Sequence, residues 1–404
     1  MDAHDSLRLL RARAVLSDPD RYQAGGGVLI RGGTVLASGP IAALRRRAPG
    51  VVERDLGDTL ITPGLVNAHA HLELGALAAS TRGALQFERW VEALVGARRA
   101  ADPSALLSER DAGARRLLET GTTTVGDIDS LGLAPLSFGP RRVVQRELLD
   151  ARDPGRREAA LGQFAAPPTL GALEHEGVSP HAPFSVSHAL LEAIAPRVER
   201  ERIPVAMHWA ETPEEVAWCD GAEAWFDRYF PREPHLHGLD ALEHAGLLGA
   251  RTALIHGNHP RPDEPRRVAE AGATVVHCPG CHTWFERGPF PLREYVEAGC
   301  HLALGTDSLA SNDDLDLRRE LTLAVGRGAW TPRQAWTAAT LGGARAVGLE
   351  GRVGRLESGF WADLSVFEDP PETLAGILEW LVESRPNLHS VWVAGQPAVG
   401  SEPV

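Results

Sequence analysis

The feature that most constrains the fold of this chain is an alternation of short β-rich runs with stretches of helical length. Stretches such as Ser187–Glu201, Asp263–Ala271 and Leu315–Val325 are amphipathic and follow β-rich runs. Strands that alternate with helices form parallel βαβ units, because a parallel neighbour needs a crossover connection. Eight such units predict an α/β fold, a (β/α)8 TIM-like barrel. The eight runs are Leu60–His71, Thr122–Ile128, Arg142–Leu148, Gly177–Ala182, Ile203–His208, Thr252–His256, Ala273–His277 and Cys300–Asp307.

The two ends of the chain are β-rich and lack this alternation. Arg31-Gly32-Gly33-Thr34 is typical of a hairpin, and Ala394-Gly395-Gln396-Pro397 is typical of a turn. We therefore predict a small β-sandwich domain formed by residues 1–60 together with residues 355–404, and a barrel domain formed by residues 61–354. The strand-like runs at the two ends are Leu9–Leu16, Gly27–Leu36, Trp361–Phe367 and His389–Val393.

The composition is that of an ordinary globular protein, with 43% hydrophobic and 24% charged residues. The formal net charge of -13 argues against nucleic-acid binding, which requires a basic surface. We find no apolar stretch that could span a membrane, and Met1–Asp5 lacks the pattern of a signal peptide, so we expect a cytoplasmic protein that binds no membrane. Four cysteines in 404 residues do not indicate a disulfide scaffold.

The chain contains no lysine, so all 41 basic residues are arginine. This absence excludes a Schiff-base lysine, a phosphate-binding loop lysine and a carbamylated lysine that bridges two metal ions.

The strongest chemical signal is the run Leu65–His71, which ends in two histidines one residue apart. Residues i and i+2 of a strand point to the same face, so His69 and His71 aim two imidazoles at one point. Such a pair is half of a divalent-metal site.

Polar residues also follow the other predicted strands, at the carboxyl ends where a barrel places its active site. One histidine at a strand end is usually a packed or rim residue, but six strands that end in this way are hard to explain by packing. The segments are His69–His71, Ser179–Pro183, His208–Glu211, His256–His259, His277–Pro279 and Thr306–Ser308.

This pattern resembles the amidohydrolase superfamily over nearly the whole chain. The order His-x-His, His, His, Asp is matched by the set His69, His71, His208, His256 and Asp307. The resemblance implies that all of these except His256 bind a metal. Without lysine the chain fits the branch with one metal, and three imidazoles with one carboxylate suit zinc or ferrous iron.

Within the superfamily the chain is more similar to the nucleoside and nucleobase deaminases. Glu211 matches their proton-shuttling glutamate, and Pro180–Pro183 and Gly305–Asn312 match segments of the adenosine and S-adenosylhomocysteine deaminases. The stretch from Thr306 to Leu317 is most similar to that of the aminodeoxyfutalosine deaminases of the alternative menaquinone pathway. The segment His277–His282 departs from the more usual polar pattern of the family.

This resemblance implies hydrolysis at the amino-bearing carbon of an adenine-like ring, with release of ammonia. Asp307 would accept the proton of the attacking water, and Glu211 would protonate the ring nitrogen. His256 would stabilise the oxygen on which charge develops. For Glu211, the alternative interpretation is a carboxylate at the start of a helix.

Four further residues are candidates for substrate binding. His181 would hydrogen-bond a ribose or ring atom, with a rim position as the alternative. Trp209 would stack on a purine, with core packing as the alternative. Arg146 would pair with a substrate carboxylate, with a surface role as the alternative. Ser308 follows Asp307 in the final-strand segment.

Other functions remain open on this scaffold. A chlorohydrolase, a guanine-type deaminase and an imidazolone-ring hydrolase use the same metal chemistry on other electrophilic carbons. A binding or scaffold protein that has lost its metal is a further alternative. For the enzyme we expect a small-molecule substrate, one divalent metal per chain and a homodimer.

Overall fold

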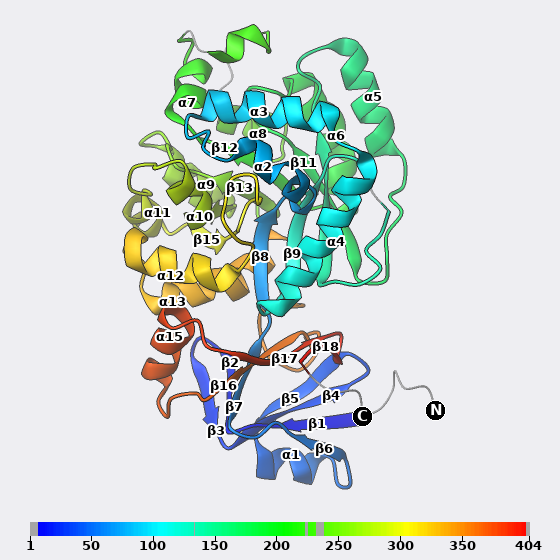
Figure 1. Cartoon of the computed structure of the whole chain (residues 1–404), viewed down its shortest axis with the longest axis vertical. Helices are drawn as coiled ribbons and strands as arrows, with labels where there is room; N and C mark the ends of the chain where they lie inside the picture. The colour runs from blue at the N-terminus through cyan, green and yellow to red at the C-terminus, as the bar shows by residue number, and fades with distance from the viewer. Residues whose placement is uncertain (1–6, 133, 223–224, 232–237, 401–404) are drawn as a thin grey trace.

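The computed structural model describes residues 7–132, 134–222, 225–231 and 238–400. Figure 1 shows a barrel with its helices at one end of the long axis and two smaller sheets at the other. In the described residues, no helix is both long enough and apolar enough to cross a membrane. All four cysteines are free, as the composition predicted.

Eight parallel strands form the barrel sheet in sequential order, which confirms the predicted (β/α)8 architecture. A parallel bridge between Ala70 and Asp307 joins the last strand segment to the first. The strands are β8 (Leu65–Ala70), β9 (Thr122–Asp129), β10 (Arg141–Leu148), β11 (Glu174–Pro180), β12 (Val205–Trp209), β13 (Thr252–His256), β14 (Thr274–His277) and β15 (His301–Leu304).

The helices begin where the sequence supplies capping residues. The side chains of Asp102, Asp153 and Ser187 each accept a hydrogen bond from a backbone N–H of the first turn that follows. The α-helices of the barrel part are α2 (Ala78–Thr81), α3 (Phe87–Ala100), α4 (Pro103–Glu119), α5 (Pro154–Ala165), α6 (His188–Glu201), α7 (Pro213–Cys219), α8 (Gly238–His244), α9 (Glu264–Ala271), α10 (Pro279–Trp284), α11 (Leu292–Ala298), α12 (Leu317–Gly328), α13 (Pro332–Thr337) and α14 (Gly343–Ala346). Shorter helical turns are η2 (Leu72–Leu77), η3 (Trp225–Arg228) and the π-helical η4 (Ala338–Gly342).

Strands from both ends of the chain form the two smaller sheets. A four-stranded sheet has the order β5-β4-β1-β6, and a six-stranded sheet has the order β18-β17-β16-β7-β2-β3. An apolar cluster that includes Leu10, Ile30, Leu364 and Trp392 draws on both sheets, as in a sandwich. The elements are β1 (Leu7–Arg11), β2 (Ala14–Asp18), β3 (Arg21–Ala24), β4 (Gly26–Arg31), β5 (Thr34–Pro40), α1 (Ile41–Arg47), β6 (Val52–Asp55), β7 (Thr59–Pro63), β16 (Leu364–Glu368), α15 (Leu374–Glu383), β17 (Leu388–Val393) and β18 (Gln396–Val399).

The predicted run Leu9–Leu16 is two strands rather than one. The chain leaves β1 in the four-stranded sheet and enters β2 in the six-stranded sheet, so Ala12 and Arg13 connect two layers. The hairpin at Gly32 and Gly33 is confirmed, because Arg31 pairs with Thr34 across it.

The barrel strands point away from the sandwich. In Figure 1, β8 rises from the sandwich side, and α2, α3 and α7 lie at the far end of the barrel. The carboxyl ends of the strands therefore face these helices, and this end holds the candidate site.

Candidate metal and active site

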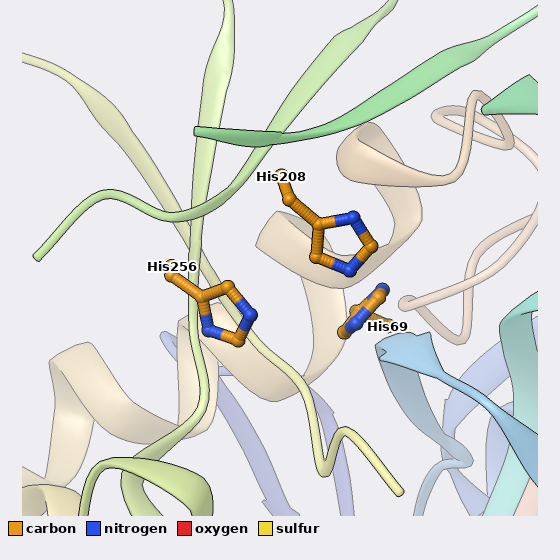
Figure 2. A group of neighbouring side chains, drawn as sticks. All are labelled: His69, His208 and His256. Atoms are coloured by element: carbon orange, nitrogen blue, oxygen red, sulfur yellow. The ribbon is translucent and has the colours of Figure 1, made fainter. Parts of the chain in front are cut away.

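Three strand ends and the segment after β15 bring five side chains to one point. His69 comes from β8, His208 from β12 and His256 from β13, and the potential ligand atoms of these three all lie within 4.8 Å of one another. Figure 2 shows the three rings converging on a common space. His69, His71 and Asp307 meet the same 4.8 Å criterion. The sequence-based prediction named all five residues.

The ring nitrogens of this cluster lie close to one another and to a carboxylate, as the ligands of a metal ion would. The Nε2 atoms of His71 and His208 lie 3.3 Å apart. The buried Nε2 of His69 has no hydrogen-bond partner among the described residues. Oδ1 of Asp307 lies 3.7 Å from Nε2 of His69 and 4.0 Å from Nε2 of His71. Three imidazoles and one carboxylate with free lone pairs fit a divalent cation.

Neighbouring groups hold two of these side chains in place. Nδ1 of His208 lies 2.9 Å from the backbone oxygen of His181, and donation of Nδ1–H to that oxygen leaves Nε2 free for a metal. The hydroxyl of Ser311 donates to Oδ2 of Asp307 at 2.8 Å, which leaves Oδ1 facing the histidines.

Burial and neighbouring charges keep these side chains in the protonation states that can bind a metal ion. Burial, with the neighbouring positive charges, lowers the pKa of His71, His208 and His256 well below the usual value, so their rings are neutral near pH 7. Burial alone would raise the pKa of Asp307, but its contact with His69 holds that pKa well below its usual range. Neutral imidazoles and an ionised carboxylate are the forms that bind metal.

Glu211 lies beside this cluster, as predicted. Its Oε1 is 3.6 Å from Nε2 of His256 and accepts a hydrogen bond from Arg287 at 2.7 Å. Burial raises the pKa of Glu211, and Arg287 opposes that shift. Glu211 precedes α7, but the carboxylate that accepts the backbone N–H groups there is Glu215, which bonds to Ala210 and Glu211. The helix-start interpretation therefore applies to Glu215.

Four residues of the cluster, His71, His208, His256 and Asp307, line a pocket of about 290 Å³. One part of the wall is aromatic, and another is polar and contains acidic side chains. His181 lines this pocket, as predicted, with Nδ1 2.7 Å from Oγ of Ser185, and burial lowers its pKa to about 4. The other lining residues include Phe87, Trp90, Phe184, Trp225 and Phe230 in the aromatic wall, and Glu73, Arg98, Ser130 and Glu147 in the polar wall.

The prediction for Arg146 is wrong. Its guanidinium bonds to Glu176 at 2.9 Å and to the backbone oxygens of Phe164 and Ala166, next to α5. Alternate residues of a strand face opposite sides, so Arg146 points out of the barrel and the next residue, Glu147, lines the pocket.

Trp209 and Ser308 are also not among the residues that line the pocket. Trp209 is 2% exposed and packs in the main apolar core, so the core-packing alternative is correct. Ser308 is fully buried, and its hydroxyl lies 3.0 Å from that of Ser311. It supports the residue that holds Asp307 and does not contact the pocket.

Sequence reasoning missed two polar residues near the cluster, Arg287 in a loop and Glu147 on β10. Arg287 gave no signal because it follows α10 in an irregular segment, 76 positions from its partner Glu211. Glu147 was passed over in favour of its neighbour Arg146. A strict alternation of faces along β10 would have found it.

A (β/α)8 barrel with histidines and an aspartate at the carboxyl ends of its strands defines a metal-dependent hydrolase of the amidohydrolase type. The comparison of sequences agrees, since the model of the amidohydrolase family matches residues 60–398. The chain belongs to this family.

Two curated relatives and one solved structure are similar over most of their lengths. An aminodeoxyfutalosine deaminase of Deinococcus radiodurans is 33% identical and covers 84% of this chain and 86% of the relative. A 5-methylthioadenosine/S-adenosylhomocysteine deaminase of Syntrophobacter fumaroxidans is 30% identical, and the match covers 90% of this chain and 84% of the relative. The crystal structure of an adenosine deaminase from Xanthomonas campestris with bound zinc superposes with a TM-score of 0.79 at 25% identity. The match covers 96% of this chain and 92% of that structure's chain. That structure and the donor set described above together support a divalent metal.

Proposed function

We propose that this protein is a metal-dependent hydrolytic deaminase of an adenine-type nucleoside. The observation that carries the proposal is that three potential ligands line one pocket together with the two proton-handling side chains, Glu211 and His256. The fourth potential ligand, His69, lies against them. The relatives named as deaminases support the same reaction.

His69, His71, His208 and Asp307 would hold the metal, with zinc as our first assignment and ferrous iron as the alternative. The metal, when bound, lowers the pKa of a water molecule and so supplies a nucleophile near neutral pH. The zinc in the Xanthomonas campestris structure supports the first assignment.

The side chains of this chain would handle the protons. Asp307 accepts the proton of the attacking water through the carboxylate that Ser311 orients. Glu211 carries a proton to the ring nitrogen next to the amino-bearing carbon, because burial raises its pKa toward neutrality. Arg287 fixes the orientation of Glu211, and His256 stabilises the developing negative charge on the oxygen.

We infer that aminodeoxyfutalosine is the first substrate to test, because the Deinococcus radiodurans relative bears that name. The aromatic wall offers stacking surface for a purine or for an apolar substituent on the sugar.

The test is an ultraviolet assay for loss of the adenine chromophore, with zinc-loaded protein. Aminodeoxyfutalosine, adenosine, 5-methylthioadenosine and S-adenosylhomocysteine are assayed in parallel. Fast turnover of the first compound alone supports the assignment to menaquinone synthesis. Turnover of one of the other compounds supports the deaminase reaction but assigns a different substrate. No turnover of any of them, with one metal bound per chain, overturns the proposal.

A further inference from the structure

Glu147 is an acidic side chain in the pocket to which the mechanism gives no role. It lies on β10 and is half-buried where it lines the pocket. Among the described residues it has no hydrogen bond or ion pair, whereas the other pocket carboxylates have partners in Arg98, Arg287 and Ser311. A polar group that is kept unpaired in a pocket requires an explanation, because its desolvation lowers stability.

The side chain of Glu147 faces the pocket, where a ligand could contact it, and not the surrounding helices. Its neighbours on β10, Arg146 and Leu148, face α5 and the main core, so the Glu147 side chain faces the interior of the barrel. In the strand register it lies opposite Ser179, two residues before His181. Glu147 and His181 therefore project from neighbouring strand ends into the same pocket.

The charged groups around Glu147 bear on which kind of ligand group it can bind. Arg98 interacts electrostatically with it, but Arg98 already bonds to Glu73 at 3.0 Å and to Ser130. Asp129 acts in the opposite sense to Arg98, and His69 acts in the same sense as Arg98. An anionic substituent in direct contact with Glu147 would be repelled by the ionised form of its carboxyl. Burial raises the pKa of Glu147 to about 7, so both its neutral and its ionised form are populated near neutral pH. A neutral hydrogen-bond donor such as a hydroxyl suits both forms of the carboxyl.

We propose that Glu147 is a specificity-determining residue that accepts hydrogen bonds from the vicinal hydroxyls of the sugar of the nucleoside. The assignment rests on the proposed function, since a nucleoside presents both a ring to the metal cluster and a diol further from it. Two acceptor oxygens on one carboxylate match two adjacent hydroxyls, and each such bond to a charged acceptor is strong.

The experiment compares E147Q with wild type on adenosine and on 2′,3′-dideoxyadenosine, which lacks the diol. We expect wild type to prefer adenosine by at least 10-fold in kcat/KM. In E147Q the value for adenosine should fall roughly 10- to 100-fold, mainly through KM, while the value for the dideoxy compound changes less than about threefold. The control E158Q removes an exposed carboxylate on α5 and should retain both values.

Two outcomes would overturn the assignment: an unchanged preference in E147Q, or an equal loss on both compounds in a variant that keeps its metal content and Tm. Calorimetric titration with inosine and with 2′,3′-dideoxyinosine provides a readout without turnover, and E147Q should lose the difference in Kd between them. If wild type deaminates no nucleoside, the proposed function fails. The titration then decides the Glu147 assignment separately, and equal Kd values for wild type on the two ligands reject it.

Discussion

At the scale of single residues, His256 and Asp307 adopt a backbone conformation that side chains rarely occupy. Their φ angles are 74° and 58°, in the left-handed region. Such a conformation costs about 1–3 kcal/mol and persists only where the surroundings enforce it. For Asp307 the enforcement is visible, because its backbone N–H donates to the oxygen of His69 at 3.1 Å. The strain therefore occurs at two residues of the cluster, where it sets the direction of their side chains.

The ligand assignment predicts a joint loss of metal and activity. In H69A and in D307N, bound metal should fall from about one ion per chain to a small fraction, because each change removes one of four ligands. Activity should fall by roughly 1,000-fold or more. Elemental analysis of the purified variants measures the metal, and the ultraviolet assay measures the activity. H244A, which changes an exposed histidine 62% accessible to solvent, is the matched control and should retain its metal.

Glu211 is predicted to separate metal binding from turnover. E211Q keeps the shape of the side chain but cannot carry a proton, so kcat should fall roughly 100- to 10,000-fold while metal content stays that of wild type. E214Q, which changes an exposed carboxylate three positions away, should behave as wild type. A rate for E211Q within threefold of wild type would show that Glu211 does not carry the proton.

The sequence could predict those site residues whose spacing along a strand has only one structural interpretation. The i, i+2 spacing of His69 and His71 predicts that their rings converge, and they do, although β8 ends at Ala70. The alternation of faces along β10 places Glu147 rather than Arg146 in the pocket. The partner of Glu211 could not be predicted, because Arg287 is brought to it by tertiary packing of a loop.

At the scale of elements, the joint between β8 and the segment after β15 brings Asp307 to the histidine cluster. The backbone N–H groups of Thr306 and Asp307 both donate to the oxygen of His69 at 3.1 Å. Nδ2 of Asn67 donates to the hydroxyl of Thr306 at 2.7 Å. These bonds fix His69 and Asp307 relative to each other, although the two residues are far apart in the sequence.

Gly305 makes this joint sensitive to a single methyl group. A Cβ at this position would lie 2.9 Å from the backbone oxygen of His69 and 3.0 Å from its Cβ. G305A should therefore displace His69, weaken metal binding and destabilise the protein by about 1–3 kcal/mol. Elemental analysis and the Tm test this expectation. G162A is the control, because a Cβ at Gly162 in α5 would meet no atom within 4 Å and should leave both measurements at or above wild type.

The number and order of the barrel strands were predictable, because each strand is a short apolar run between helical stretches. The division of Leu9–Leu16 into two strands was not, because nothing local marks a change of sheet at Ala12 and Arg13. That change depends on which layer each half packs against.

At the scale of the whole molecule, the sandwich part and the barrel share apolar packing. Phe367, Ile377 and Leu381 from β16 and α15 belong to the same core cluster as Trp336 and Leu321 of the barrel helices. The predicted limits at residues 60 and 355 remain a prediction. Since α15 packs on α12 and α13, we expect the two parts to unfold together.

Three buried carboxyls should each contribute a loss of stability as pH rises from about 5 to 8, whereas the buried histidines with lowered pKa values contribute a gain over the lower part of this range. Burial raises the pKa of Glu147, Glu215 and Glu320 to about 7, from an ordinary value of 4.5. At pH 4 these carboxyls are neutral in both states, so they contribute no difference. Between pH 4.5 and 7 the unfolded chain releases their protons while the folded chain retains them, which favours unfolding. Each group should lower the free energy of unfolding by about 3 kcal/mol across this range.

The variant E147Q measures one of these contributions separately, because replacing Glu147 by glutamine breaks no hydrogen bond of that side chain within the described residues. The difference in the free energy of unfolding between E147Q and wild type should grow in favour of E147Q by up to about 3 kcal/mol from pH 4 to pH 8. Denaturant unfolding at equal metal loading measures it, and the exposed change E158Q should show no such growth. A pH-independent difference for E147Q would mean that Glu147 ionises at its ordinary pKa in the folded state. Its carboxylate would then be hydrated in the pocket.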